Sequence, residues 1–105
     1  MYIQIINFNL KDVSEEEYRN LCDQLAPNFA DLPGLVSKAW LADSDSNTYG
    51  GVYVWRDREA MVDFTKTELF NAVATHPNLA NITSKDFAIL EGPTRVTRGL
   101  VEAKV

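Results

Sequence analysis

The chain of 105 residues is poor in the residues that mark several common classes of protein. Its single cysteine, Cys22, excludes an internal disulfide and fits a reducing cytoplasm. Its single histidine, His76, has no cysteine or second histidine at ligand spacing, so a catalytic metal is not expected. No apolar run approaches the roughly 18 residues that a membrane span needs.

Basic residues are scarce as well. Ten Lys and Arg against 15 Asp and Glu give a net charge of −5, which argues against nucleic acid or an anionic membrane as partner. The glycine motifs of nucleotide-binding proteins and the nucleophile motif of serine hydrolases do not occur, so no cofactor is expected. The opening sequence MYIQIINF reads as a strand and not as a signal peptide, so we expect a cytoplasmic protein.

The residues that are present predict six elements in the order βαββαβ. Four strands are expected, at about 2–9, 35–42, 49–55 and 85–91. One helix is expected after Ser14 and another after Asp57, an order typical of a ferredoxin-like α+β sandwich with an antiparallel sheet. The length allows one domain, with a core over about 2–91 and a C-terminal arm over about 92–105. Residues 94–101 of that arm are expected to be extended.

Local patterns define the two expected helices. Ser14 and Glu17 form a capping box, and Pro27 predicts a kink or an early end of the first helix. Between them runs an apolar stripe at helical spacing, made of Tyr18, Leu21, Cys22, Leu25, Ala26 and Phe29. In the second helix the apolar spacing changes phase at Thr65 and Glu68, which resemble another capping box. We therefore expect two short helices with a bend between them.

Three segments, PGLVSKAW, GGVYVW and RDREAMVDF, resemble the YdhR-like monooxygenases. That family belongs to the dimeric α+β barrel group, which includes antibiotic-biosynthesis monooxygenases. The resemblance covers about residues 2–91 and is sharpest in K-x-W at 38–40 and G-G-x-Y at 50–53. It implies an oxidoreductase that forms a homodimer whose two sheets pack face to face, with a ligand pocket between sheet and helices in each protomer.

Two polar positions on the predicted strands are candidates for chemistry. Asn7 lies in an apolar strand, on the face expected to look toward the helices, and needs a hydrogen-bond partner there. That partner is either neighbouring backbone or a substrate oxygen. Lys38 and Trp40 share one face of the second strand. Either the lysine is solvated with its stem over the ring, or the ammonium and the indole N–H face a developing oxyanion.

Aromatic residues and the histidine supply further candidates. Tyr53 and Trp55 share a face of the third strand and belong either to the core or to a site, because both carry a polar group. His76 either satisfies carbonyl groups at the end of a helix or acts as a general base. Cys22 lies within the apolar stripe of the first helix and is expected in the core.

These candidates lead to one main hypothesis, which rests on the resemblance. It is a cofactor-independent monooxygenase that acts on a small aromatic or polyketide-like substrate bound between sheet and helices. Asn7, Lys38 and Trp40 are the expected donors and His76 the expected base. The expected pocket walls are Tyr53, Trp55, Phe64 and Phe70. The alternatives are a non-catalytic dimer that binds a small apolar ligand, and a non-redox isomerase, cyclase or decarboxylase on the same fold.

The sequence does not match the pattern of a haem-degrading branch of the same fold. That branch carries an Asn on the first strand, a Trp on the second helix and a nearby His. Here Asn7 matches, whereas Phe64 and Ala74 occupy the positions expected for the Trp and the His. His76 lies two residues further along and would point to the wrong side of a helix.

A homodimer is the expected assembly. Two helices cover only one face of a four-stranded sheet, and the other face would carry Ile6 and Phe8 of the first strand. The last strand has apolar residues on both faces, with Phe87 on one and Leu90 on the other. Exposure of so apolar a face is unusual in a monomer, so we expect a second copy to cover it.

Overall fold

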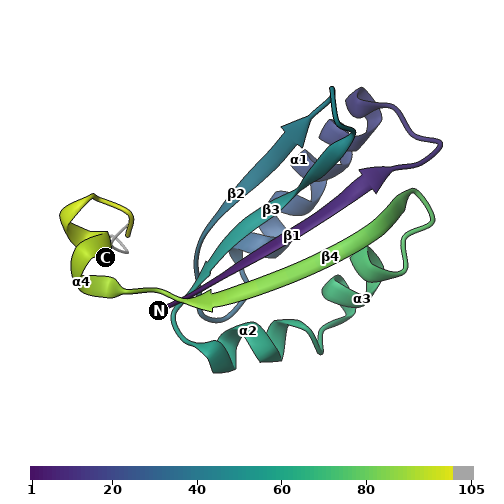
Figure 1. The fold of residues 1–105 in the computed structure, drawn as a ribbon. Helices are drawn as coiled ribbons and strands as arrows, with labels where there is room; N and C mark the ends of the chain where they lie inside the picture. Colours follow the sequence, from purple (N-terminus) through teal and green to yellow (C-terminus); the bar gives the residue numbers. More distant parts are fainter. Residues whose placement is uncertain (101–105) are drawn as a thin grey trace.

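The computed structural model describes residues 1–100, which form a four-stranded antiparallel sheet with helices on one face (Figure 1). The strands are β1 Tyr2–Leu10, β2 Leu35–Asp43, β3 Thr48–Trp55 and β4 Leu79–Ala88, in the sheet order β2-β3-β1-β4. The helices are α1 Glu15–Ala30, α2 Arg58–Phe64, α3 Glu68–Ala74 and α4 Glu91–Val96. The predicted ferredoxin-like α+β fold is confirmed. None of these helices has the length and apolar character that crossing a membrane requires.

Helix α1 begins as predicted and runs longer than predicted. The Ser14 side chain accepts a hydrogen bond from the Glu17 N–H, and the Glu17 side chain accepts from the Ser14 N–H, which confirms the capping box. Pro27 does not end the helix, which continues to Ala30. Because proline has no N–H, the Asp23 carbonyl lacks its usual helical hydrogen bond. Pro27 and Asp23 are both exposed, so this missing bond lies on the solvent side of the helix.

The second helical segment is two short helices, as predicted, but the cap between them is different. Thr67 is the N-cap of α3 and accepts a hydrogen bond from the Phe70 N–H at 3.1 Å. Thr65, the predicted cap, instead ends α2. Asp57 caps α2 as predicted, since its carboxylate accepts from the Ala60 N–H at 2.8 Å.

Strand β4 and the arm that follows differ most from the sequence prediction. The strand starts at Leu79, six residues before the predicted start at 85, because it pairs with β1 almost from end to end. The early start of β4 was not predicted because the sequence NITSKD is polar. An edge strand, which has one open side, tolerates such residues. The arm is not extended over 94–96, because α4 spans Glu91–Val96. Residues 101–105 of the predicted arm lie outside the described residues.

The two faces of the sheet are the reverse of those predicted. Gln4, Ile6 and Phe8 are buried toward the helices, so Ile5 and Asn7 look away from them. The period-two pattern of β1 is apolar on both faces and therefore did not distinguish them. Gln4 is tolerated in the core because its Oε1 accepts from the Trp55 indole N–H at 3.1 Å.

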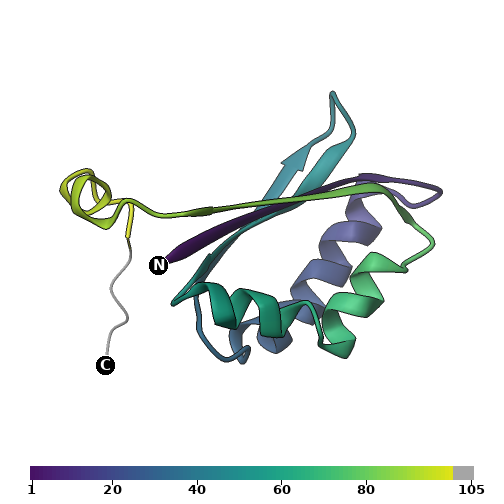
Figure 2. The ribbon, with the colours of Figure 1, turned by 60° about the horizontal axis from the view of Figure 1, so that its bottom comes forward.

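The helices lie on one side of the sheet (Figure 2), and an aromatic core fills the space between the two layers. Its buried residues are Ile6, Phe8, Tyr18, Phe29, Tyr49, Tyr53, Trp55, Ala60, Met61 and Phe64. Close strand pairing depends on Gly50, which has a φ of 147° and lies against β1. A Cβ there would come within 1.8 Å of the Ile6 carbonyl oxygen, so only glycine fits.

No element among residues 1–100 covers the opposite face of the sheet (Figure 2). This open face is aliphatic along β1 and β3, whereas Thr83 and Lys85 of β4 make its edge polar. The strand register places Ile3, Ile5, Val52 and Val54 together on this open face, with Phe87 beside them at 53% exposure. Helix α4 lies beyond the edge of the helical layer, near the N-terminus, where the Met1 amine contacts a Glu91 carboxylate oxygen at 2.6 Å.

Candidate functional site

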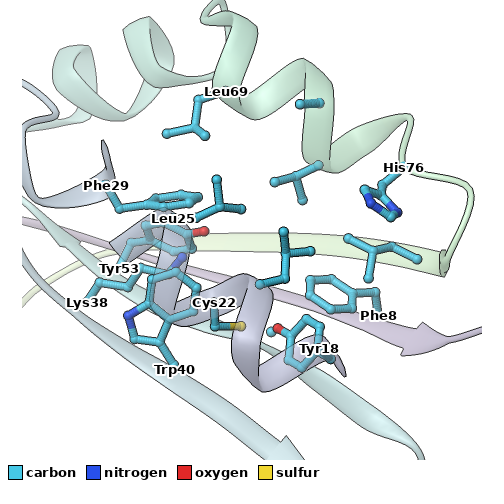
Figure 3. A pocket seen from close by; sticks show the side chains of 15 residues that line it. Phe8, Tyr18, Cys22, Leu25, Phe29, Lys38, Trp40, Tyr53, Leu69 and His76 are labelled. Atoms are coloured by element: carbon cyan, nitrogen blue, oxygen red, sulfur yellow. The ribbon is translucent and has the colours of Figure 1, made fainter. Parts of the chain in front are cut away.

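An apolar cavity of about 220 Å³ lies between α1, α3 and the sheet (Figure 3). Helix α1 supplies the largest share of its walls, through the stripe that its capping box and helical spacing create. The lining residues are Phe8, Tyr18, Leu21, Cys22, Leu25, Phe29, Lys38, Trp40, Gly50, Tyr53, Leu69, Ala72, Val73, His76 and Leu79. Few of these side chains carry a polar atom, so each such atom has a large effect on what the cavity binds.

Lys38 brings the only ammonium into this lining. Strand β2 pairs Lys38 with Tyr53 of β3, which places both side chains on the helix-covered face. The Lys38 Nζ lies 3.4 Å from the ring centroids of both Phe29 and Trp40, and 4.6 Å from that of Tyr53. Gly51 makes room for the lysine stem, since a Cβ there would lie 2.8 Å from Lys38 Cε. The ammonium is thus enclosed by three aromatic rings.

The environment of Lys38 brings its two protonation states close in free energy. No hydrogen bond or ion pair joins its Nζ to any other residue of the described chain. Burial lowers the pKa of Lys38 to about 7, against an ordinary value of 10.5. The ring faces favour the ammonium, whereas desolvation favours the neutral amine. At neutral pH the cavity therefore offers both a charged donor and a free amine.

Two tyrosines and the cysteine supply hydroxyl and thiol groups to the same cavity. Burial raises the pKa of Tyr53 above its ordinary range, so its hydroxyl stays protonated. Burial, and then hydrogen bonding with Cys22, raises the pKa of Tyr18 in the same way. Burial also raises the pKa of the Cys22 thiol, which makes it a poor nucleophile. These groups act as neutral donors beside Lys38.

His76 lies across the cavity from Lys38 (Figure 3). Its Nδ1 accepts a hydrogen bond from the Asn78 backbone N–H at 3.1 Å. The neutral imidazole in this arrangement carries its proton on Nε2. The remaining ring nitrogen therefore donates a hydrogen bond, which favours a role in orienting a ligand over the predicted role of general base.

Of the eight residues predicted from the sequence, the structure brings four together around the cavity: Lys38, Trp40, Tyr53 and His76. The Trp40 indole packs by one edge on Phe29, and its nitrogen is turned away from His76 (Figure 3). Its ring therefore contacts Lys38, and its N–H does not face the same space as the histidine. The roles predicted for these residues stay predictions.

The other four predicted residues do not line this cavity. Asn7 looks away from the helices, contrary to the predicted orientation, and its Nδ2 donates to the Tyr49 carbonyl at 3.4 Å. Trp55 and Phe64 are buried in the core, and Phe70 packs on the outer edge of Phe64. Helical phase explains the difference, because α3 turns Leu69 and Val73 to the cavity and Phe70 to the core.

Sequence reasoning missed most of the wall that α1 provides. Tyr18, Cys22, Leu25 and Phe29 were recognised as one apolar stripe and interpreted as core. The spacing of an apolar stripe is the same whether it packs against a filled core or borders a cavity. No local signal separates the two cases.

Comparison with known proteins identifies the family. The family model described as "Putative mono-oxygenase ydhR" matches residues 3–100. The chain belongs to the YdhR family. Its resemblance to YdhR-like proteins, first seen in the segments around Lys38 and Gly50, is thereby confirmed. No curated protein matches it in sequence.

Solved structures share the fold of this YdhR family member at low sequence identity. SnoaB, a cofactor-independent oxygenase from Streptomyces nogalater, has a TM-score of 0.66 and 22% identity, over 86% of this chain and 94% of its own. An antibiotic biosynthesis monooxygenase has a TM-score of 0.69 and 16% identity, over 86% and 99%. The heme-degrader MhuD from Mycobacterium tuberculosis has a TM-score of 0.68 and 17% identity, over 86% and 96%. At such identities the likeness shows the fold alone.

The cavity does not fit haem as a resident group. The structure of MhuD contains two hemes in its active site. In this chain the one imidazole that borders the cavity is His76, whose Nδ1 is engaged by Asn78 and whose Nε2 carries the proton. Iron ligation through Nε2 requires the other tautomer, with the proton on Nδ1. No cluster of three metal-ligating side chains occurs in residues 1–100 either.

Proposed function

We propose that this YdhR family member is a cofactor-independent monooxygenase that acts on a small aromatic or polyketide-like molecule. The observation that carries this proposal is the Lys38 amine, which lies in an apolar cavity without a polar partner among the described residues. The aromatic and aliphatic walls suit a flat apolar substrate. Family membership and the fold shared with SnoaB support the same class of activity.

Lys38 is the proposed base and counter-ion. Its neutral amine accepts the acidic proton of a bound phenol or enol, because its pKa of about 7 is matched to neutral pH. The ammonium that results stays beside the phenolate or enolate and stabilises it in a water-poor space. Such an anion can itself give an electron to dioxygen, so the protein supplies binding, proton transfer and charge stabilisation.

The experiment is turnover of an anthrone-like substrate by purified protein, with and without oxygen. Oxygen-dependent product formation is expected, with a loss of about 100-fold in Lys38→Met, because removal of a general base typically costs 10²–10⁴. Lys66→Met, which removes an exposed lysine from the turn between α2 and α3, is the matched control and should be unchanged. Equal turnover without oxygen would leave isomerase, cyclase or decarboxylase chemistry in place of oxygenation.

The apolar walls also favour a second candidate, a protein that binds a small apolar ligand without transforming it. Cavities with this lining bind as readily as they catalyse. Thermal unfolding in the presence of phenolic compounds separates the two, because a ligand that binds only the folded state raises the melting temperature. Stabilisation without any product, in air, favours the binding protein over the enzyme.

We also propose that the protein works as a homodimer joined through the open face of the sheet. Ile3, Ile5, Val52 and Val54 form a continuous aliphatic surface there, and Phe87 extends it. Monomers rarely leave a contiguous apolar patch of this kind exposed. A twofold axis through this face buries it against the same surface of a second copy. The cavity lies on the other side of the sheet and remains accessible in each protomer.

Light scattering at low micromolar concentration tests the assembly. The expected mass is about twice the 11.8 kDa of one chain. A stable monomer at that concentration would overturn the dimer while leaving the proposed chemistry of the cavity untouched.

A further inference from the structure

Lys38 is unlike the other lysines of the described chain in being enclosed. Lys11, Lys66 and Lys85 are exposed, whereas Lys38 is flanked by the rings of Phe29 and Trp40, each at 3.4 Å from Nζ. An exposed lysine is protonated at neutral pH and its nitrogen is not nucleophilic. An enclosed amine without hydrogen bonds keeps a lone pair available toward the cavity.

We propose that the cavity captures an apolar aldehyde or ketone as an imine on the Nζ of Lys38. This inference does not rest on the proposed oxygenation, because imine formation needs no oxygen. It rests on the juxtaposition of an amine without a polar partner, a protonated hydroxyl and apolar walls in one cavity. The proposed ligands are therefore aromatic or aliphatic carbonyl compounds small enough for about 220 Å³.

Tyr53 supplies the hydroxyl to which we assign the proton transfers that this reaction requires. Its ring centroid lies 4.6 Å from Nζ, its side chain lines the cavity, and its hydroxyl has no hydrogen-bond partner within residues 1–100. Attack by the Nζ lone pair forms the C–N bond and moves the carbonyl π electrons to oxygen. Tyr53 gives its proton to that oxygen and recovers one from the nitrogen, which yields a neutral carbinolamine.

The second half of the reaction removes water. The C–O bond breaks as the hydroxyl takes a proton from Tyr53, and the nitrogen lone pair forms the C=N bond. The nitrogen then returns its remaining proton to the tyrosinate. The balance is one amine and one carbonyl compound giving one imine and one water, with no change of oxidation state.

The other groups around Lys38 define which carbonyl compounds fit. Helix α1 contributes Cys22, whose thiol stays neutral, to the cavity that contains Lys38. Helix α3 contributes aliphatic side chains such as Leu69. His76, across the cavity, presents an Nε2–H donor (Figure 3). A carbonyl compound with an acceptor at its far end would reach both Lys38 and His76.

Reductive trapping tests the proposal on the wild-type protein without any variant. Benzaldehyde and sodium cyanoborohydride are added without oxygen, and each labelled lysine is identified by peptide mapping, which also separates the Met1 amine. Lys38 is expected to be labelled about tenfold faster than Lys11 or Lys66 at neutral pH, since a desolvated lysine is the usual Schiff-base former. Equal labelling of all lysines would overturn the proposal.

Two matched controls sharpen the result. Lys38→Arg keeps a cation but removes the primary amine, so the fast labelling is expected to vanish, whereas Lys66→Arg should retain it. Glycolaldehyde, which is small and polar, should show a smaller preference for Lys38 than benzaldehyde does, because it reacts with the same available amine but gains nothing from the apolar walls. Fast labelling that persists in Lys38→Arg would show that another amine is responsible and would overturn the proposal. Because oxygen is excluded, failure here is distinct from failure of the oxygenase assay.

Discussion

The two faces of the sheet in this YdhR family member are built from different residues and have different consequences. The helix-covered face carries large rings, among them Tyr53 and Trp55, and encloses a cavity that contains Lys38. The open face carries branched aliphatic residues such as Ile5 and Val52, which form a flat surface. The helices enclose a cavity against the rings of the first face, whereas no element among residues 1–100 covers the second face (Figure 2). One face is therefore suited to a ligand and the other to a second sheet.

Loss of a ring from the helix-covered face is expected to have the largest effect. Trp55 is fully buried, and its indole N–H is bonded to Gln4. Trp55→Ala should destabilise the fold by about 3–5 kcal/mol, because it leaves a cavity and a buried amide without its partner. Urea unfolding measures the change. A loss below about 1 kcal/mol would mean that the core can collapse around the missing ring.

A charge on the open face is expected to break the dimer while sparing the fold. Ile5→Lys places a second ammonium beside Lys85 in the proposed interface, at a cost of about 3 kcal/mol, so dimer affinity should fall by more than about 100-fold. Sedimentation of the variant against wild type measures this loss. Lys66→Glu, which changes charge at an exposed site away from this face, should leave the dimer intact. A variant at Ile5 that still dimerises would place the interface elsewhere.

The half-buried amine of Lys38 makes stability depend on pH. Its pKa of about 7 lies below the ordinary 10.5, so the unfolded chain binds more protons between these values and wild-type stability rises with pH across that window. Lys38→Met removes the cost of burying the ammonium. It should stabilise the protein by about 2 kcal/mol at about pH 6, and this gain should fade by about pH 10. The expected gain is smaller than the free energy that the whole pKa shift corresponds to, because Lys38 keeps some contact with solvent.

Thermal unfolding at several pH values measures this prediction, with Lys66→Met as the control for an exposed lysine. Any gain in stability from the methionine side chain itself is independent of pH. The difference between the gain at low pH and the gain at high pH therefore measures the effect of the Lys38 charge. A gain that is the same at all pH values would show that Lys38 keeps an ordinary pKa.

The smallest effect is expected at Asn7. Its one side-chain hydrogen bond among the described residues, to the Tyr49 carbonyl, is long at 3.4 Å. Asn7→Ala should cost about 0.5–1 kcal/mol in stability, and it should change ligand affinity in the cavity by less than about twofold. Calorimetry with a ligand identified by the stabilisation screen checks the second part. A tenfold loss of affinity would restore the substrate-binding role first predicted for Asn7.

Local signals in the sequence were sufficient for most elements. The capping box at Ser14, the cap at Asp57 and the change of phase near Thr65 predicted where helices begin and bend, because these are interactions within a few residues. The start of β4 was not predictable in this way. Its residues are polar, and only pairing with β1 makes them a strand.

The candidate site was also predicted only in part, because some of its features follow from local spacing and others from tertiary packing. Lys38 was predicted together with Trp40, because residues two apart on a strand share a face. The pairing of β2 with β3 then brings Tyr53 to both of them. The choice between the two faces, which removed Asn7 from the site, depended on where the helices packed.

The sequence by itself determined the βαββαβ order of the core, the helix caps at Ser14 and Asp57, the family and the pairing of Lys38 with an aromatic neighbour. These features follow from periodicity and short-range hydrogen bonds, which depend only on residues close together in the sequence. The tertiary structure decided which face of β1 is buried and that the α1 stripe borders a cavity. It also decided that Lys38 has no polar partner among residues 1–100. These properties depend on contacts between residues distant in sequence, and a local pattern is compatible with more than one such set of contacts.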